Sequence, residues 1–199
     1  MQPYFFPYAG YFQLMANVDL FVFLDDVQYI KRGWINRNKI SNQYFTVPVI
    51  KSSQTTKINQ IFIQHGWVKD HLKKFIHTYG NKIQENHVFQ SYQTYEKYDM
   101  LCQLNCNSLM FVSKILNIKV NFDFASNYPS KNTGESRILE LCDLFKAKEY
   151  YNLPNGVNLY NFDNFESKGI KLNFVDTSQQ PRTSIIESLF HGNANNLRF

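Results

Sequence analysis

Short apolar runs alternate along the chain with longer segments whose apolar residues recur at helical spacing. Residues 19–25, "DLFVFLD", are a short apolar run of the kind that forms a buried strand. Further strands are expected at residues 43–50, 58–64, 118–126, 149–153 and 170–176. Helices are expected at residues 11–18, 67–80, 95–117, 133–147, 160–169 and 184–191.

Strands that alternate with helices predict an α/β layered fold, with a mixed or largely parallel sheet flanked by helices. We expect one domain over residues 1–199, with a polar, turn-rich boundary between two sub-halves near residues 126–135. Pro3 and Pro7 stiffen the first loop, and Gly10 permits a close backbone approach or a special turn. This loop, helix and strand resemble the start of nucleotidyltransferase-like folds, although the histidine pair of those enzymes is absent.

Two adjacent carboxylates, Asp25 and Asp26, end the first apolar run. They should lie at the carboxyl end of a strand, where α/β sheets place their ligands. There a carboxylate accepts a proton, holds an amine or binds a divalent cation. The structural alternative is that one carboxylate caps the following turn while the other pairs with Arg32 or Arg37.

The next residues mix rings, amides and arginines at a density that folding alone does not require. Arg32 and Arg37 carry forked donors suited to phosphate or carboxylate. Trp34 is expected either to stack on a base or sugar ring or to anchor the loop in the core. Tyr29 and Asn36 have the groups to hydrogen-bond a polar ligand. The stretch therefore indicates an anionic, ring-bearing ligand.

A second polar and aromatic loop, "YYNLPNGVNLY", follows the strand expected at residues 149–153. Asn152, Asn155 and Tyr160 could reach sugar hydroxyls from this second wall, or the loop is simply surface. His65, between a strand and a helix, is a candidate general base, with a surface or capping role as the alternative. The five histidines lack the spacing of a helical metal pair, so no histidine zinc site is expected and no metal ligand is assigned.

Composition narrows the class of protein. The net charge of +5, from 21 Lys and Arg against 16 Asp and Glu, is too scattered to indicate nucleic-acid binding. Three cysteines without a paired motif are typical of a reducing cytoplasm, where we expect the protein. No membrane span, signal peptide, Walker loop or dinucleotide-binding glycine motif is expected.

The opening stretch "MQPYFFPYAGYFQLMANVDLFVFLDDVQYIKRGWINRNKI" and the later "TGESRILELCDLFKAKEYYNLPNGVNLYNFDNFESKGIKLNFVD" resemble the WbqC-like family over nearly the whole chain. The family's motif falls on Gln2, Pro3, Tyr4, Pro7, Gly10, Asp25, Asp26, Gln28, Tyr29, Trp34, Asn36 and Arg37. The resemblance implies a bacterial protein of surface-polysaccharide gene clusters.

The resemblance also implies an activity, namely transfer of an acyl or aminoacyl group to the amine of a nucleotide-linked sugar. The donor would be acyl-CoA or an acyl carrier protein, with no other cofactor. The alternative is a non-catalytic module that binds a sugar nucleotide or an assembly partner. The candidate catalytic residues are Asp25, Asp26 and His65. The candidate substrate-binding residues are Gln2, Tyr4, Gln28, Tyr29, Arg32, Trp34, Asn36, Arg37, Asn152 and Asn155.

Overall fold

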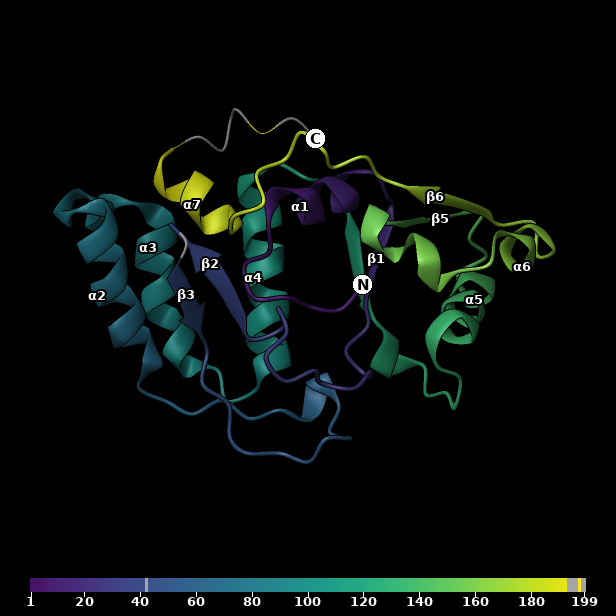
Figure 1. Ribbon diagram of the computed structural model, residues 1–199, viewed down its shortest axis with the longest axis horizontal. Coiled ribbons are helices and arrows are strands. Elements are labelled where there is room, and N and C mark those ends of the chain that lie inside the picture. The colour runs from purple at the N-terminus through teal and green to yellow at the C-terminus, as the bar shows by residue number, and fades with distance from the viewer. Residues whose placement is uncertain (42, 193–196, 198–199) are drawn as a thin grey trace.

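The computed structural model describes residues 1–41, 43–192 and 197, and strands alternate with helices along it (Figure 1). The helices are α1 (Ala9–Ala16), α2 (Trp67–Tyr79), α3 (His87–Tyr92), α4 (Leu101–Ile115), α5 (Gly134–Leu144), α6 (Phe162–Glu166) and α7 (Ile185–Phe190). The strands are β1 (Leu20–Phe23), β2 (Arg37–Ile40), β3 (Gln43–Thr46), β4 (Asn121–Phe124), β5 (Glu149–Asn152) and β6 (Lys171–Phe174).

The strands form three two-stranded sheets among the described residues. β1 pairs in parallel with β4, and β5 pairs in parallel with β6, while β2 and β3 form an antiparallel hairpin. Helices flank all three pairs (Figure 1). The predicted α/β class, with mixed sheets flanked by helices, is confirmed.

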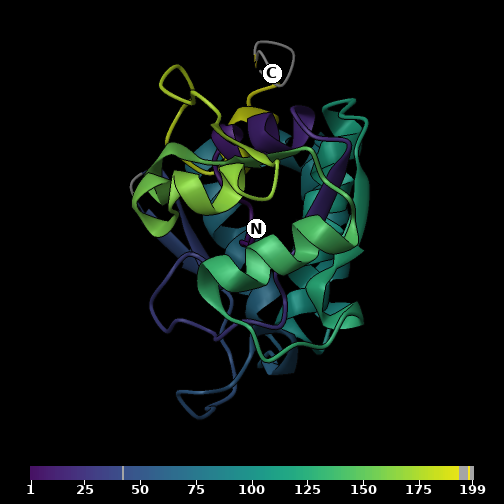
Figure 2. The same cartoon turned by 90° about the vertical axis from the view of Figure 1, so that its right-hand side faces the viewer.

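α4 runs through the middle of the molecule and divides its two sides (Figure 1). α2, α3 and the β2–β3 hairpin lie on one side, and β5, β6, α5 and α6 lie on the other. Figure 2 views the second side face on, with α5 and α6 nearest the reader. The parallel pair of β1 and β4 lies between α4 and this second side.

Aromatic side chains build the core on the α2 side. The ring of Phe5 packs edge-on against Trp67, with ring centroids 5.9 Å apart, and Phe75 packs edge-on against Tyr92 at 5.0 Å. A smaller apolar cluster lies between α5 and α6 and contains Ile138, Leu139, Cys142, Phe165 and Ile170. The single-domain division with a boundary near residues 126–135 stays a prediction.

Two sequence predictions are wrong in their bounds or type. Residues 58–64 were expected to be a strand, but Ile58–Gln60 is a 3₁₀ helix, and only isolated bridges follow it. The helix expected over residues 95–117 begins at Leu101. The two segments meet here, since the Leu101 N–H donates to the Ile61 carbonyl at 2.9 Å and the Ile63 N–H donates to the Asp99 carbonyl at 2.8 Å.

Further differences concern elements that periodicity does not reveal. β2 lies inside the polar stretch that was interpreted only as a site, and α3 was not predicted. β3 ends at Thr46, two residues before Pro48, which cannot donate a ladder hydrogen bond. The helix that ends before Gly80 and the strand after Asp19 are confirmed.

His71 of α2 is buried among the core rings, and it makes the free energy of unfolding depend on acid pH. Its two nitrogens lie 2.7 Å from the Tyr92 hydroxyl and 3.0 Å from the Thr46 carbonyl oxygen. Burial lowers the pKa of His71 from its ordinary 6.5 to about 4. The unfolded chain therefore binds the proton more readily, and the free energy of unfolding falls as the pH drops from 6.5 toward 4.

We expect His71→Gln to flatten this acid dependence. The wild-type protein should lose about 3 kcal/mol between pH 6.5 and 4 through this residue. Urea denaturation at pH 7, 5.5 and 4.5 measures the slope. His77→Gln, on the exposed face of the same helix, is the control and should keep the wild-type slope. Equal slopes in wild-type and His71→Gln would contradict the assignment.

Candidate binding cleft

A cleft of about 840 Å³ opens between the first loop, the segment after β1 and the loop after β5. Its position follows from the strands, since Leu24 continues β1 and Leu153 continues β5. Side chains that follow the carboxyl ends of parallel strands are the usual ligand contacts of α/β proteins. The volume is typical of small-molecule sites.

The described lining is largely aromatic, apolar and amide-bearing. It consists of Met1, Gln2, Tyr4, Pro7, Tyr8, Leu24, Val27, Gln28, Ile30, Trp34, Asn38, Gly134, Glu135, Arg137, Ile138, Tyr150, Asn152, Leu153, Asn155, Gly156, Leu159, Tyr160 and Arg182. Two of these described residues are arginines, and Glu135 is the one carboxylate among them.

One wall is a hydrogen-bonded trio that ends β5. The Asn152 amide donates to the Tyr160 hydroxyl at 2.8 Å, and the hydroxyls of Tyr150 and Tyr160 lie 3.0 Å apart. Burial raises the pKa of both phenols, so they stay protonated at neutral pH. Gly156 packs against this trio, because a Cβ there would lie 2.9 Å from the Asn152 amide nitrogen. The wall is therefore rigid, polar and uncharged.

Arg137 of α5 is a buried cation in the lining of the cleft. Its guanidinium donates to the Asp26 carboxylate at 3.1 Å and to the Glu140 carboxylate at 2.9 Å. It also donates to the carbonyls of Ala125 and Tyr128 at 2.8 and 2.7 Å. With these four partners the arginine positions the surrounding backbone, and few of its donors remain for a ligand.

Asp25 has a structural role of its own. Its carboxylate accepts from the Ser126 N–H at 3.0 Å and from the Ser126 hydroxyl at 2.6 Å, and the residue is buried. The expected pairing of an aspartate with Arg32 or Arg37 is thus replaced by a pairing of Asp26 with Arg137, far along the chain. Neither aspartate lines the cleft.

Arg182 supplies an exposed cation to the same cleft. Its guanidinium lies over the Tyr8 ring, 5.1 Å from the ring centroid. None of the ion pairs found among the described residues involves it. An arginine held by an aromatic face keeps its donors free for an anion.

Six of the ten candidate substrate-binding residues line the cleft. They are Gln2, Tyr4, Gln28, Trp34, Asn152 and Asn155. The Tyr4 hydroxyl donates to the Gln2 side chain at 3.2 Å, and the Gln28 amide donates to the Gln54 carbonyl at 2.6 Å. Trp34 is exposed, as a ring that stacks on a ligand must be.

The other predicted residues lie outside the described lining. Arg37 stacks on Tyr44, with 4.6 Å between its guanidinium carbon and the ring centroid, and also donates to the Arg32 carbonyl. Asn36 is buried and donates to the Val47 carbonyl at 2.8 Å, which joins two chain segments. These arginine and amide side chains therefore hold neighbouring chain segments together, which accounts for their number in this stretch.

Tyr29 and His65 also lie away from the cleft lining. Tyr29 is buried, and burial raises the pKa of its phenol. His65 Nε2 lies 2.9 Å from the Asp99 carboxylate, in the exposed turn before α2. This pairing agrees with the surface alternative considered for His65.

Sequence reasoning missed Arg137 and Arg182. Arg137 carried a signal, because it interrupts the apolar stripe of its helix beside Ile138 and one turn before Leu141. A cation on a buried helix face needs a partner, and Asp26 is that partner. Arg182 carried no comparable signal, since it lies in a polar stretch, and only the fold brings it to Tyr8.

Two searches for membrane and metal features concern the described residues alone. Within residues 1–41, 43–192 and 197, no helix combines the length and apolar content needed to cross a bilayer. In the same part of the chain, no three His, Cys, Asp or Glu side chains gather as a metal site requires.

Comparison with known proteins gave two matches. A family model described as the WbqC-like protein family matches residues 2–194. A relative from Mycobacterium tuberculosis (strain ATCC 25618 / H37Rv), named "Uncharacterized protein Rv1507c", is 27% identical over 211 residues. The alignment covers 96% of this chain and 91% of the relative. No solved structure matches the chain significantly.

Proposed function

Since the chain belongs to the WbqC-like protein family, we propose that its cleft binds a nucleotide-linked amino sugar and orients the sugar amine for acyl or aminoacyl transfer. In this proposal the reaction belongs to bacterial surface-polysaccharide synthesis and takes place in the cytoplasm. The donor would be acyl-CoA or an acyl carrier protein. The observation that carries the proposal is a cleft of sugar-nucleotide size in which rings, amides and a free guanidinium converge.

The lining supports an anionic ligand with rings. Arg182 would bind the phosphates, because a guanidinium matches phosphate oxygens with two parallel donors. Trp34 presents an exposed ring face for a base or a sugar, while the Tyr8 ring holds the Arg182 guanidinium. Asn152 and Asn155 would hydrogen-bond sugar hydroxyls from the opposite wall. Arg182, Trp34 and Asn155 are exposed, whereas Asn152 is buried and would have to give up its bond to Tyr160 to reach a ligand.

The chemistry needs a group that takes the proton from the attacking ammonium. Asp25, Asp26 and His65 lie outside the lining, so the proposal places this role on Glu135. Its two carboxylate oxygens accept from the Asn161 N–H and the Asn164 amide.

A second candidate function, a binding module without turnover, has one observation in its favour. Glu135 is the one described carboxylate of the lining, and both of its oxygens are already hydrogen-bonded. A module of this kind would hold a sugar nucleotide for another enzyme. Product formation with a nucleotide amino sugar and acyl-CoA or acyl carrier protein separates the two candidates, because a module binds and never turns over.

We expect Arg182→Ala to weaken the binding of the matching nucleotide sugar by about 10- to 100-fold, through loss of charge-assisted hydrogen bonds. Thermal shift with a panel of nucleotide sugars, with and without magnesium, identifies the ligand, and titration calorimetry measures the affinity. Arg37→Ala is the matched control outside the lining and should bind like the wild type. Weakening by Arg37→Ala alone would place the phosphate elsewhere, and no shift with any nucleotide sugar would contradict the proposal.

A further inference from the structure

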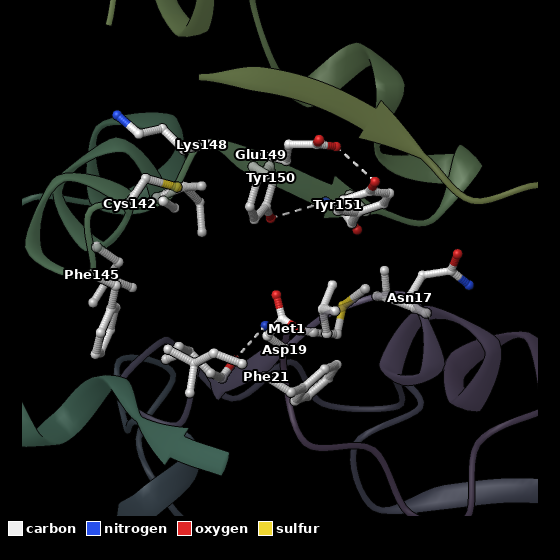
Figure 3. A pocket seen from close by; sticks show the side chains of 18 of the residues that line it. Met1, Asn17, Asp19, Phe21, Cys142, Phe145, Lys148, Glu149, Tyr150 and Tyr151 are labelled. Carbon is white, nitrogen blue, oxygen red and sulfur yellow. Dashed lines mark hydrogen bonds between the residues drawn. The ribbon is translucent and has the colours of Figure 1, made fainter. Parts of the chain in front are cut away.

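A second cleft of about 570 Å³ separates the two parallel strand pairs (Figure 3). Consecutive residues of both inner strands line it, at positions 19–22 on the β1 side and 148–152 on the β5 side. Side chains along a strand alternate between two faces, so a cavity under one face would be lined by every second residue. Lining by consecutive residues means that the edges of both strands, with their backbone groups, face this cleft.

The hydrogen bonds of β1 show which backbone groups turn to the cleft. The Asp19 carbonyl accepts from the Asn121 N–H at 2.9 Å, on the side of β4. By alternation the carbonyls of Leu20 and Val22 point the other way. The Val22 carbonyl indeed accepts from the Met1 nitrogen, at 2.8 Å.

β5 presents its edge in the same manner. The carbonyls of Lys148 and Asn152 accept from the N–H groups of residues 171 and 175, at 2.8 and 3.0 Å, on the side of β6. By alternation the backbone groups of Glu149 and Tyr151 turn to the cleft. Two strand edges that face each other across a cleft are a template for one further strand.

Met1 sets the register and direction of that strand. Its nitrogen donates to the Val22 carbonyl, and its carbonyl accepts from the Leu24 N–H at 2.9 Å. These are the two bonds that a residue makes when it pairs in parallel opposite Phe23. Chain that runs into the Met1 nitrogen in this register would therefore lie along the edge of β1, inside the cleft.

β1 and β5 run in the same direction along the cleft. Leu24 and Asn152, at their carboxyl ends, also line the binding cleft. Asp19 and Lys148, at their amino ends, line only the cleft between the strands. A strand parallel to β1 would thus be parallel to β5 as well.

Helices close the two remaining sides of the cleft (Figure 3). Cys142 and Phe145 of the α5 region lie on one side, and Asn17 of the α1 region lies on the other. The apolar side chains of Leu141, Leu14 and Val18 also line the cleft. A strand in this position would turn its alternate side chains to both helices. Strands buried on both faces are continuously apolar, so the segment that fits is apolar along its length.

We propose that the cleft between β1 and β5 is a strand slot, which receives an extended apolar segment of about five residues joined to the nitrogen of Met1. The segment would complete one parallel sheet in the order β4, β1, segment, β5, β6. The proposal does not depend on the sugar-nucleotide ligand.

The burial of the Met1 nitrogen supports a peptide bond at this point. Desolvation lowers the pKa of the Met1 ammonium from 8.0 to about 5. An amide N–H in its place keeps the hydrogen bond to the Val22 carbonyl and carries no charge that burial would penalise.

The completed sheet also accounts for the position of the binding cleft. In chain order the segment would be followed by β1 and β4 on one side and by β5 and β6 on the other. Such a sheet has a topological switch point beside the segment, and ligands of doubly wound folds bind outside the carboxyl ends of the strands there. Gln2 and Leu153 line the binding cleft at this place.

The test compares four proteins, each containing all 199 residues. The first is the chain as printed, and the second carries the added residues Met-Lys-Val-Ile-Val-Ile before Met1. The third carries Met-Lys-Pro-Ile-Pro-Ile, in which proline removes the amide donors that a central strand needs. The fourth is the printed chain with an acetylated amino terminus, which removes the charge without adding a strand.

We expect the Val-Ile extension to raise the Tm by at least about 5 °C. It should also slow hydrogen exchange at the amides of Val22, Glu149 and Tyr151 by 10-fold or more, as expected for newly paired strand edges. The proline extension should give neither effect. Equal behaviour of the two extensions, or unchanged exchange at these amides, would overturn the proposal.

The pH dependence separates strand pairing from simple removal of the charge. In the protein without an extension, the pKa of the Met1 ammonium is lower in the folded state than in the unfolded state. Its free energy of unfolding should therefore rise as the pH increases from 5 to 8. Acetylation and the Val-Ile extension should both remove this rise, but only the extension should protect the edge amides. Protection by acetylation equal to that by the extension would contradict the strand slot.

Discussion

Arg137→Ala is expected to destabilise the protein by about 3–5 kcal/mol, because it leaves a buried carboxylate without its counter-ion. The side chains of Arg137 and Asp26 are 5% and 13% exposed, and their charged atoms lie 3.1 Å apart. The alanine variant also leaves two backbone carbonyls, of Ala125 and Tyr128, without a donor. Guanidinium denaturation measures the loss.

Glu140→Gln is the matched control for this prediction, because it removes the more exposed partner of the same arginine. An ion pair with one exposed member contributes little to the free energy of unfolding, because solvent screens it. The double variant Arg137→Ala with Asp26→Asn should recover part of the loss, since it also removes the stranded charge. A cost of Arg137→Ala no greater than that of Glu140→Gln would show that the arginine is not the tie between α5 and the segment after β1.

Asn105→Leu is expected to cost about 2–4 kcal/mol, because two buried carbonyls lose their donor. The Asn105 amide on α4 donates to the Pro3 carbonyl at 2.9 Å and to the Ile35 carbonyl at 2.7 Å. The side chain therefore joins the first loop, which lines the cleft, to the stretch after β1. The variant should also bind the nucleotide sugar more weakly, since both walls loosen. Urea denaturation and calorimetry measure the two effects.

Asn107→Leu, two residues further along α4, provides the comparison. Asn107 is exposed, and its amide donates only to the Gln103 carbonyl of its own helix, at 2.8 Å. Its replacement should change the free energy of unfolding by less than about 0.5 kcal/mol. Similar losses for the two variants would contradict the role of the bonds to Pro3 and Ile35, because Leu has the higher helix propensity and propensity alone predicts no loss.

The cleft combines six of the ten candidate substrate-binding residues with some residues that sequence reasoning missed. Gln2, Trp34 and Asn152 were predicted because polar tips and rings cluster after the expected strands. Arg182 was missed, because its partner ring at Tyr8 lies far away along the chain. The family assignment was confirmed over residues 2–194, and the activity stays a proposal.

The sequence by itself determined the local elements and the family. A helix over Trp67–Tyr79 that ends at Gly80, and short apolar strands at Leu20–Phe23 and Lys171–Phe174, follow from periodicity and from helix-stop residues. These features depend on neighbouring residues, and so a sequence pattern contains them.

Only the tertiary structure decided which charges meet and which strand edges stay open. Asp26 pairs with Arg137, 111 residues away, although Arg32 and Arg37 are close to it in the chain. The Leu101 N–H donates to the Ile61 carbonyl and the Ile63 N–H donates to the Asp99 carbonyl, where the sequence predicted a separate strand and a helix. Hydrogen bonds and ion pairs form between groups that packing brings together, and sequence distance does not determine those partners. Likewise, only the tertiary structure brings the edges of β1 and β5 to opposite sides of one cleft.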